Sequence, residues 1–179
     1  MTQTTRLHCA CGQVHLEVVR APIVSAECYC NSCRAAGARL QSLSAAAPIL
    51  GENGATRFVL YRKDRVRIVA GADRLREFRL TPGAKTRRVV AACCNTPIFL
   101  EFHNGHWLSL YGCLWQNGTL PPLEVRTMTS DLPDASVLPD DVPNSRRQSI
   151  AFFARLLGAW IAMGLRSPTV AGINGEIQA

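Results

Sequence analysis

The sequence predicts a mainly β protein with a C-terminal helix. Short runs of β-branched and aromatic residues alternate with turn signals through the first two thirds of the chain. A strongly apolar run near the C-terminus is typical of a helix, and seven of the eight cysteines gather in three short groups. A length of 179 residues suits one domain with a sizeable core and an appendage. We therefore expect a compact antiparallel β domain over 1–115, an extended Pro-rich arm over 116–144, an apolar helix over 145–166 and a disordered tail over 167–179.

The first two strands are expected between residues 12 and 27. Val14, Leu16 and Val18 alternate with polar residues, and a second apolar run follows Pro22. Alternation with a period of two is typical of a strand that buries one face. The segment therefore predicts two strands joined by a turn.

The middle of the chain contains the clearest strand signals. Four strands are predicted, over 56–61, 65–70, 74–80 and 86–92. Because they are short and the turns are nearly evenly spaced, we expect an antiparallel meander. Two further strands, 97–102 and 107–111, are predicted to form a hairpin across Asn104-Gly105. The histidines beside that turn, His103 and His106, are expected to be exposed.

The C-terminal helix is expected from about Ser145 to Leu165. Its surface is very apolar, with Ile150, Phe152, Phe153, Leu156, Leu157, Trp160, Ile161, Met163 and Leu165. The apolar run is shorter than the roughly 20 residues that a membrane span needs, and Arg155 lies within it. Membrane spanning is therefore not predicted. We expect the helix to dock on the β domain or on a second copy of the chain in a homodimer, with attachment to a membrane interface as the alternative.

The formal net charge of +7 comes almost entirely from arginine, since Lys63 and Lys85 are the only lysines. A basic surface attracts phosphates, acidic lipids or small molecules that carry carboxylates. No basic motif interleaved with aromatic residues accompanies this charge. A nucleic-acid partner is therefore not predicted.

Three thiols lie within six residues at Cys28, Cys30 and Cys33. A tight turn can aim all three sulfurs at one point, and Zn²⁺ is the cation that best suits thiolates in tetrahedral geometry. The chain from Arg34 to Asn53 is rich in small side chains, which fits a segment wrapped around a metal site. Arg34 directly follows the three cysteines and is a candidate for contact with any ligand bound there.

Two cysteine pairs far apart in the chain are candidates for a second site, and they are Cys9 with Cys11 and Cys93 with Cys94. Structural zinc sites usually take two short cysteine turns from distant segments. Gly12 and Asn95 directly follow these pairs, and both residue types tolerate the positive φ that such turns need. Neighbouring residues of an extended strand point to opposite faces, so Cys93 and Cys94 can share a metal only if the chain turns there. One of them could instead serve the three middle cysteines.

Disulfides in an exported protein are the alternative to metal binding. Residues 1–13 contain no apolar core of a signal peptide. Clustered cysteines in an unexported chain indicate metal or redox chemistry rather than bridges, and they predict a cytoplasmic protein. The remaining cysteine, Cys113, is expected to be a small buried apolar side chain.

These motifs resemble those of the glutathione-dependent formaldehyde-activating enzyme family, which also includes centromere-protein-V-like proteins. The shared order is Cys-x-Cys-Gly, a strand, Cys-x-Cys-x-x-Cys-Arg, a long β-rich middle and a late cysteine turn, over about residues 7–112. The resemblance implies a compact zinc-binding β fold. It also implies a structural zinc, whose ligands match Cys9, Cys11 and Cys94, and a more open zinc, whose ligands match Cys28, Cys30 and Cys33.

The late motif departs from the family pattern. Ala91 stands where the usual Cys-x-x-Cys-Gly has its first cysteine, so Cys93 would have to replace it as a ligand. The segment 91–97, with the sequence Ala-Ala-Cys-Cys-Asn-Thr-Pro, resembles an uncharacterised branch of the family.

Two functions follow from the resemblance and the motifs. The first is a carbon–sulfur lyase that acts on a thiol–aldehyde adduct such as S-hydroxymethylglutathione, with zinc held at the catalytic residues Cys28, Cys30 and Cys33 and with Arg34 binding substrate. The alternative is a non-catalytic binding module that zinc stabilises. Three protein ligands at the middle cysteines favour the enzyme, and four protein thiolates favour the module.

Overall fold

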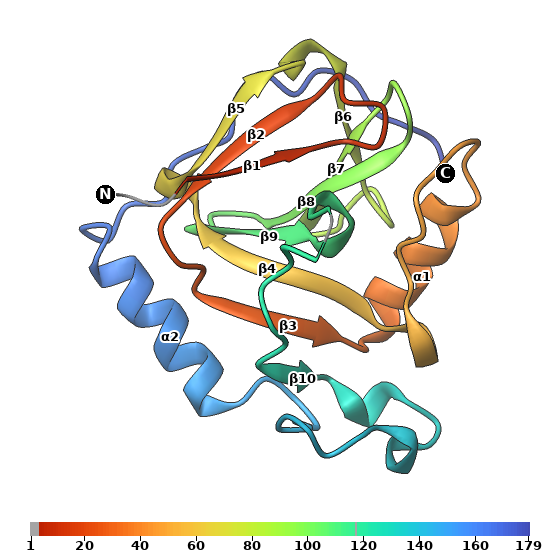
Figure 1. Cartoon of the computed structure of the whole chain (residues 1–179), viewed down its shortest axis with the longest axis vertical. Helices are drawn as coiled ribbons and strands as arrows, with labels where there is room; N and C mark the ends of the chain where they lie inside the picture. The colour runs from red at the N-terminus through yellow and green to blue at the C-terminus, as the bar shows by residue number, and fades with distance from the viewer. Residues whose placement is uncertain (1–3, 117) are drawn as a thin grey trace.

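The computed structural model describes residues 4–116 and 118–179 and has two β-sheets and two α-helices in these ranges (Figure 1). The small sheet has the order β1-β2-β5, with β1 (Thr4–His8), β2 (His15–Val19) and β5 (Val66–Ala70). The large sheet has the order β10-β3-β4-β9-β8-β7-β6. Its strands are β3 (Val24–Cys28), β4 (Thr56–Arg62), β6 (Leu75–Phe78), β7 (Thr86–Ala91), β8 (Thr96–Phe102), β9 (Trp107–Tyr111) and β10 (Val125–Thr127). The mainly β prediction is confirmed.

The large sheet is buried on both faces, as β4 illustrates. Val59 and Tyr61 belong to a core cluster shared with residues of the small sheet. Phe58 and Leu60, which alternate with them, belong to a second cluster shared with both helices. Because successive side chains of a strand point to opposite faces, a strand between two layers is apolar throughout. The molecule therefore has three layers, with the large sheet in the middle.

The strands predicted from the sequence agree closely with strands of the structure, although β1 was not predicted. Of the four strands predicted as a meander, only β6 and β7 pair with each other. The hairpin of β8 and β9 forms as expected, with Leu100 opposite Ser109. By contrast, β5 does not pair with β4 or β6, and it joins β2 instead, with Leu16 opposite Ile68. A 3₁₀ turn over Lys63–Arg65, with Lys63 buried, redirects the chain after β4. Consecutive strands are consequently distributed between two sheets.

Helix α1 (Asn31–Gln41) was not anticipated, because the sequence from residue 34 onward is small and weakly patterned. Its buried face consists of small residues and one leucine, namely Cys33, Ala36, Gly37 and Leu40. A Cβ atom at Gly37 would lie only 2.4 Å from Leu50 Cδ2. Small side chains therefore let α1 pack closely against its neighbours. Because the helix buries small residues rather than a stripe of large apolar ones, its sequence has no clear helical pattern.

The arm and the tail are attached to the large sheet. Strand β10, within the segment expected to be an extended arm, pairs in parallel with β3. Buried Arg126 of β10 forms ion pairs with Glu27 (3.1 Å) and Asp141 (2.7 Å). The tail expected to be disordered from residue 167 instead runs beside β6, where Glu77 bonds through its N–H to the Gly175 carbonyl (3.0 Å). Backbone hydrogen bonds at a sheet edge thus accommodate a segment that has little apolar pattern.

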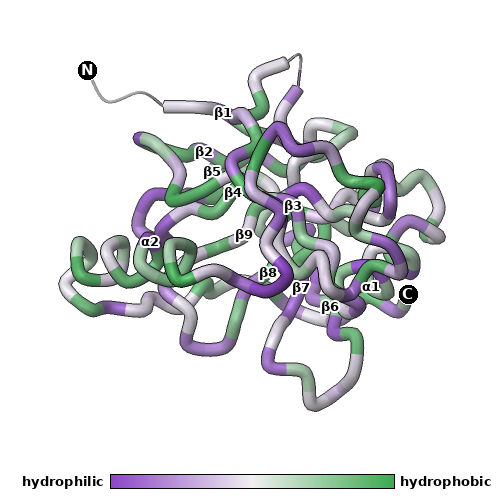
Figure 2. The backbone as a smooth tube through the Cα atoms, turned by 90° about the horizontal axis from the view of Figure 1, so that it is seen from below, coloured by the Kyte–Doolittle hydropathy of each residue, from purple (hydrophilic) through white to green (hydrophobic). Residues whose placement is uncertain are grey.

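Helix α2 spans Ile150–Ile161, a shorter range than the expected helix from 145 to 165. It begins at residue 150 because the Ser149 hydroxyl caps it by accepting a hydrogen bond from the Phe152 N–H (3.2 Å). Hydrophobic residues colour much of its tube green in Figure 2. No helix among the described residues is long and apolar enough to cross a membrane.

Only one face of α2 packs on the domain. Leu156 is buried in the second core cluster, while Phe153 and Leu157 are more than half exposed. His106, expected to be exposed, is buried under this helix, where its Nε2 lies 2.8 Å from the Leu156 carbonyl and its ring stacks on Trp160. The expected docking on the β domain thus accounts for only part of the apolar surface of the helix.

Adjacent leucines of α2 provide a matched test of this packing. Leu156→Ala should lower the free energy of unfolding by about 2–3 kcal/mol, because it removes buried apolar contacts. Leu157→Ala should change it by less than about 0.5 kcal/mol, because the side chain is exposed on the same helix. Denaturant unfolding at several protein concentrations measures both. If Leu157→Ala lowered the free energy of unfolding as much as Leu156→Ala does, and if this loss grew with protein concentration, a second copy of the chain would cover this face instead.

Candidate metal centres and the adjoining cavity

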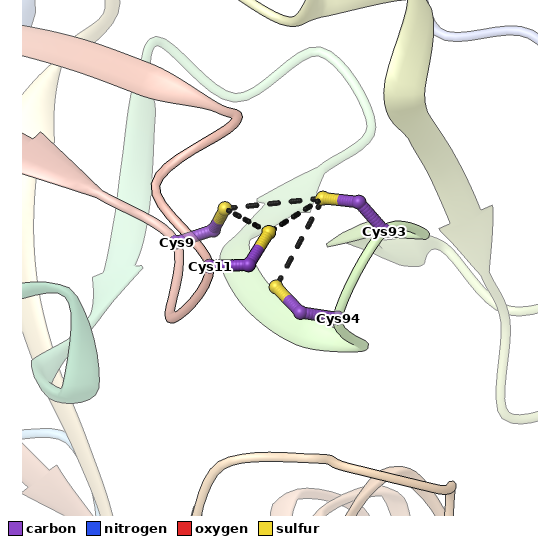
Figure 3. A group of neighbouring side chains, drawn as sticks. All are labelled: Cys9, Cys11, Cys93 and Cys94. Atoms are coloured by element: carbon purple, nitrogen blue, oxygen red, sulfur yellow. Dashed lines mark hydrogen bonds between the residues drawn. The ribbon is translucent and has the colours of Figure 1, made fainter.

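The first cysteine group joins two loops from different sheets (Figure 3). Cys9 and Cys11 lie on the loop between β1 and β2, and Cys93 and Cys94 lie on the turn between β7 and β8. The Sγ atoms are 3.6 Å apart for Cys9 and Cys11, 3.4 Å for Cys11 and Cys93, and 3.9 Å for Cys93 and Cys94. All four sulfurs lie within 4.8 Å of one another. We call this group the closed centre.

The backbone explains how both adjacent cysteines reach one point. Asn95 has a φ of 52° and Gly12 a φ of 71°, which confirms the expected positive φ after each pair. The chain turns at residues 92–95 rather than continuing as a strand, and the Cys94 N–H donates to the Ala91 carbonyl (3.2 Å). The structure therefore groups Cys93 with the closed centre and not with the three middle cysteines.

The thiols of the closed centre differ in their acidity. Burial opposes ionisation of Cys94, but hydrogen bonds, above all from the Thr96 hydroxyl, lower its pKa to about 6. Burial raises the pKa of Cys93 and of Cys9. Without a cation, the group therefore resists carrying several thiolates at once.

The donor set of the closed centre fits a tetrahedral metal ion. Four sulfurs about 2.3 Å from a central zinc in tetrahedral geometry would be about 3.8 Å apart. Four of the distances between sulfurs, those of Cys9–Cys11, Cys9–Cys93, Cys11–Cys93 and Cys93–Cys94, are 3.4 to 3.9 Å and therefore close to that value. Thiolate ligands in this arrangement suit Zn²⁺.

The second cysteine group lies where β3 leads into α1, and we call it the open centre. Cys28 is the last residue of β3, Cys30 is the N-cap of α1 and Cys33 lies in its first turn. The three Sγ atoms lie within 4.8 Å of one another. Among the described residues, no fourth cysteine, histidine or carboxylate joins them. The motif was expected on a loop, but a helix begins inside it.

The open centre favours one shared negative charge. Hydrogen bonds from the Cys28 and Cys33 thiols lower the pKa of Cys30 to about 2. The same contacts with Cys30 raise the pKa of Cys28 to about 11 and raise the pKa of Cys33 well above its usual value. The Cys33 N–H also donates to the Cys30 sulfur (3.4 Å), which therefore caps the helix. An anionic sulfur at a helix N-terminus is favoured by the partial positive charge there.

A cavity of about 520 Å³ adjoins the open centre, and all three of its cysteines line it. The large sheet supplies one wall, which includes Phe58, Leu60 and Leu100. Helix α2 supplies another through Phe152, Phe153 and Leu156. In Figure 1, α1 and α2 lie near opposite ends of β3, and the cavity spans the sheet face between them. This volume is in the range of sites for small organic ligands.

One functional candidate was missed from the sequence. Arg88 of β7 lines the cavity although only 1% of its surface is exposed. Its Nη2 donates to the Ser32 carbonyl (3.3 Å), between Cys30 and Cys33 in the chain, while Nε and Nη1 have no hydrogen-bond partner among the described residues. A sequence signal exists, because Arg88 and the buried Val90 occupy alternate positions of one strand and therefore share a face.

Other candidates from the sequence lie outside both centres. Arg34, expected to bind substrate, does not line the cavity, and its Nη1 donates to the Asp131 carbonyl (3.2 Å). The two histidines nearest Cys9 and Cys11 in the sequence, His8 and His15, join no group of potential metal ligands among the described residues. Cys113 packs against the second core cluster and contacts the Pro97 carbonyl (3.8 Å), as expected for a small apolar side chain.

One protein family matches the part of the chain that carries both cysteine centres. The family model of the glutathione-dependent formaldehyde-activating enzyme matches residues 4–125, a range that includes both cysteine centres. No curated protein matches the chain. A crystal structure of a Rhodobacter sphaeroides protein from structural genomics is similar, with 16% sequence identity, a TM-score of 0.46 and coverage of 78% of this chain and 99% of that chain. Because the family model covers more than half of the sequence, the chain belongs to the glutathione-dependent formaldehyde-activating enzyme family.

Proposed function

We propose that the protein is a zinc-dependent carbon–sulfur lyase that acts reversibly on thiol–aldehyde adducts of the S-hydroxymethylglutathione type. The observation that carries the proposal is the open centre, where three protein sulfurs converge beside a cavity and no fourth protein ligand joins them among the described residues. Catalytic zinc sites typically have three protein ligands and an open position for water or substrate. Family membership supports a formaldehyde-activating or related function.

The two centres would have different roles, one in stabilising the fold and one in catalysis. Four sulfurs complete the closed centre, so a metal there would have no open position and would stabilise the fold. The open centre fits a metal as well, because its three soft donors lie close together and one of them ionises readily. Zinc bound by Cys28, Cys30 and Cys33 would supply a Lewis acid that stabilises a thiolate or polarises an oxygen.

The reaction needs no oxidant or reductant. In the adduct R–S–CH₂–OH the carbon–sulfur bond breaks, and its electron pair stays on sulfur to give a thiolate. The hydroxyl group releases its proton to the solvent as the carbon–oxygen bond becomes the carbonyl of formaldehyde. The reverse reaction forms the carbon–sulfur bond by attack of the thiolate on that carbonyl.

The residues of the chain would bind and orient the adduct for this reaction. A bound adduct would displace water from the largely apolar cavity, which would strengthen the electrostatic interactions inside. The guanidinium of Arg88 lies against the chain segment that carries Cys30 and Cys33, so its positive charge favours the thiolate that develops on the leaving sulfur. Its buried position makes this charge more effective than it would be in water.

Loss of a closed-centre ligand should unfold the protein. Cys11 is exposed, so Cys11→Ala removes little apolar contact, yet it should lower the metal content and cause unfolding or aggregation. Structural zinc sites contribute on the order of 10 kcal/mol of binding energy to folding. Thermal unfolding and metal analysis measure the effect, with Cys113→Ala as the control because Cys113 joins neither centre. A melting temperature that did not change after chelator treatment would contradict a structural metal.

Loss of an open-centre ligand should have the opposite result. A serine at position 30 can still cap α1, because its hydroxyl accepts a hydrogen bond from the Cys33 N–H. Cys30→Ser should therefore keep the fold but lose one metal ion per chain and the lyase activity. Metal analysis, circular dichroism and NMR detection of formaldehyde release from S-hydroxymethylglutathione and other adducts measure these effects. Full activity with the open centre free of metal would exclude the proposed mechanism.

A further inference from the structure

Apolar side chains supply most of the wall of the cavity beside the open centre. Besides the sheet and helix residues already named, Phe102 and Trp107 from the hairpin of β8 and β9 line it. Its polar side chains other than the cysteines are few, namely Ser32, Thr86, Arg88, Ser109, Thr127 and Gln148. Walls of this kind favour a ligand whose body is apolar, because burial of apolar surface is the main favourable contribution to its binding.

Arg88 is the one charged side chain among the described residues that line the cavity. Among the described residues it forms no ion pair with a carboxylate, and its Nε and Nη1 have no hydrogen-bond partner. The nearby Tyr111 is no counter-ion either, because burial raises its pKa and keeps the phenol neutral. A buried positive charge is costly unless a negative charge lies nearby. The sulfurs of the open centre and of a bound thiolate would supply that charge, so no cation of the described lining remains for a further carboxylate of the ligand.

Glutathione fits these walls poorly. It carries two carboxylates, one ammonium group and two peptide groups, and each needs a partner once it leaves water. Because the described lining offers one cation and no anion, the ammonium group and at least one carboxylate would remain unpaired. A buried charge without a partner disfavours binding strongly.

We propose that the thiol part of the substrate has an uncharged, apolar body, such as an aryl-alkyl or alkyl chain, and is not glutathione. The sulfur lies at the open centre, where its thiolate charge is balanced by Arg88. The body extends toward Phe153 and the other apolar residues of α2. This inference rests on the proposed lyase function and names the substrate class of the same site.

Direct binding tests the preference. The zinc-loaded full chain is titrated anaerobically with 2-phenylethanethiol and, separately, with glutathione in a calorimeter. We expect 2-phenylethanethiol to bind at least tenfold more tightly than glutathione. Equal or tighter binding of glutathione, or no binding of 2-phenylethanethiol, overturns the proposal.

Two single variants of α2, one at a phenylalanine and one at an isoleucine, test whether the thiol binds in the cavity. Phe153 and Ile161 are exposed to a similar extent, 57% and 60%, on the same helix, but only Phe153 lines the cavity. Phe153→Ala should weaken binding of 2-phenylethanethiol by roughly tenfold, because apolar contact is lost, and Ile161→Ala should leave it unchanged. An equal effect of both variants, or of neither, would show that the thiol binds elsewhere.

The same proteins separate this inference from the lyase function. Cleavage is measured for the formaldehyde adducts of both thiols. Faster cleavage of the 2-phenylethanethiol adduct supports both proposals. Faster cleavage of the glutathione adduct overturns the inference and keeps the lyase function. Cleavage of neither adduct, with 2-phenylethanethiol still bound more tightly, overturns the lyase function and keeps the binding preference.

Discussion

The contact of four sulfurs at the closed centre is the constraint on which the arrangement of the two sheets depends. Cys9 and Cys93 are 84 residues apart in the chain, yet their sulfurs are 3.9 Å apart. The loop between β1 and β2 is thereby held against the turn between β7 and β8. Thiolates this close would repel one another, so a bound cation is what would make the contact stable. With this end fixed, the small sheet covers one face of the large sheet, and the other face is left for the helices and the cavity.

Features that depend on local pattern could be predicted from the sequence. The alternation of Val14, Leu16 and Val18 and the Asn104-Gly105 turn located strands because side-chain direction and turn type follow from a few neighbouring residues. The turns after Cys11 and Cys94 were predictable for the same reason, since glycine and asparagine tolerate positive φ. The cysteine spacing itself indicated two sites, and the described residues form two clusters of cysteines.

Features that depend on contacts between distant segments could not be predicted in this way. The departure of β5 to the small sheet is decided by its fit beside β2, where Ile68 lies opposite Leu16. Helix α1 packs through Ala36 and Gly37, whose small size matters only because the sheet is close. In the sequence, Arg88 is one of several arginines in a basic strand. Its role depends on the position of β7 beside the first turn of α1. In each case the neighbour that gives the residue its role lies elsewhere in the sequence.

The same donor chemistry gives two different centres because the secondary structure around each is different. In the closed centre, two tight turns meet and each contributes a pair of sulfurs, so four donors surround one point. In the open centre, all three sulfurs come from one segment, and the start of α1 fixes Cys30 and Cys33 on one side of that point. The opposite side faces the cavity, which is lined by α2 and the large sheet. Among the described residues, no second cysteine turn approaches the centre from this side. The lack of a fourth sulfur at the open centre therefore follows from the absence of a second cysteine turn among the described residues. Under the proposed function, α2 would help to determine what kind of molecule reaches this centre.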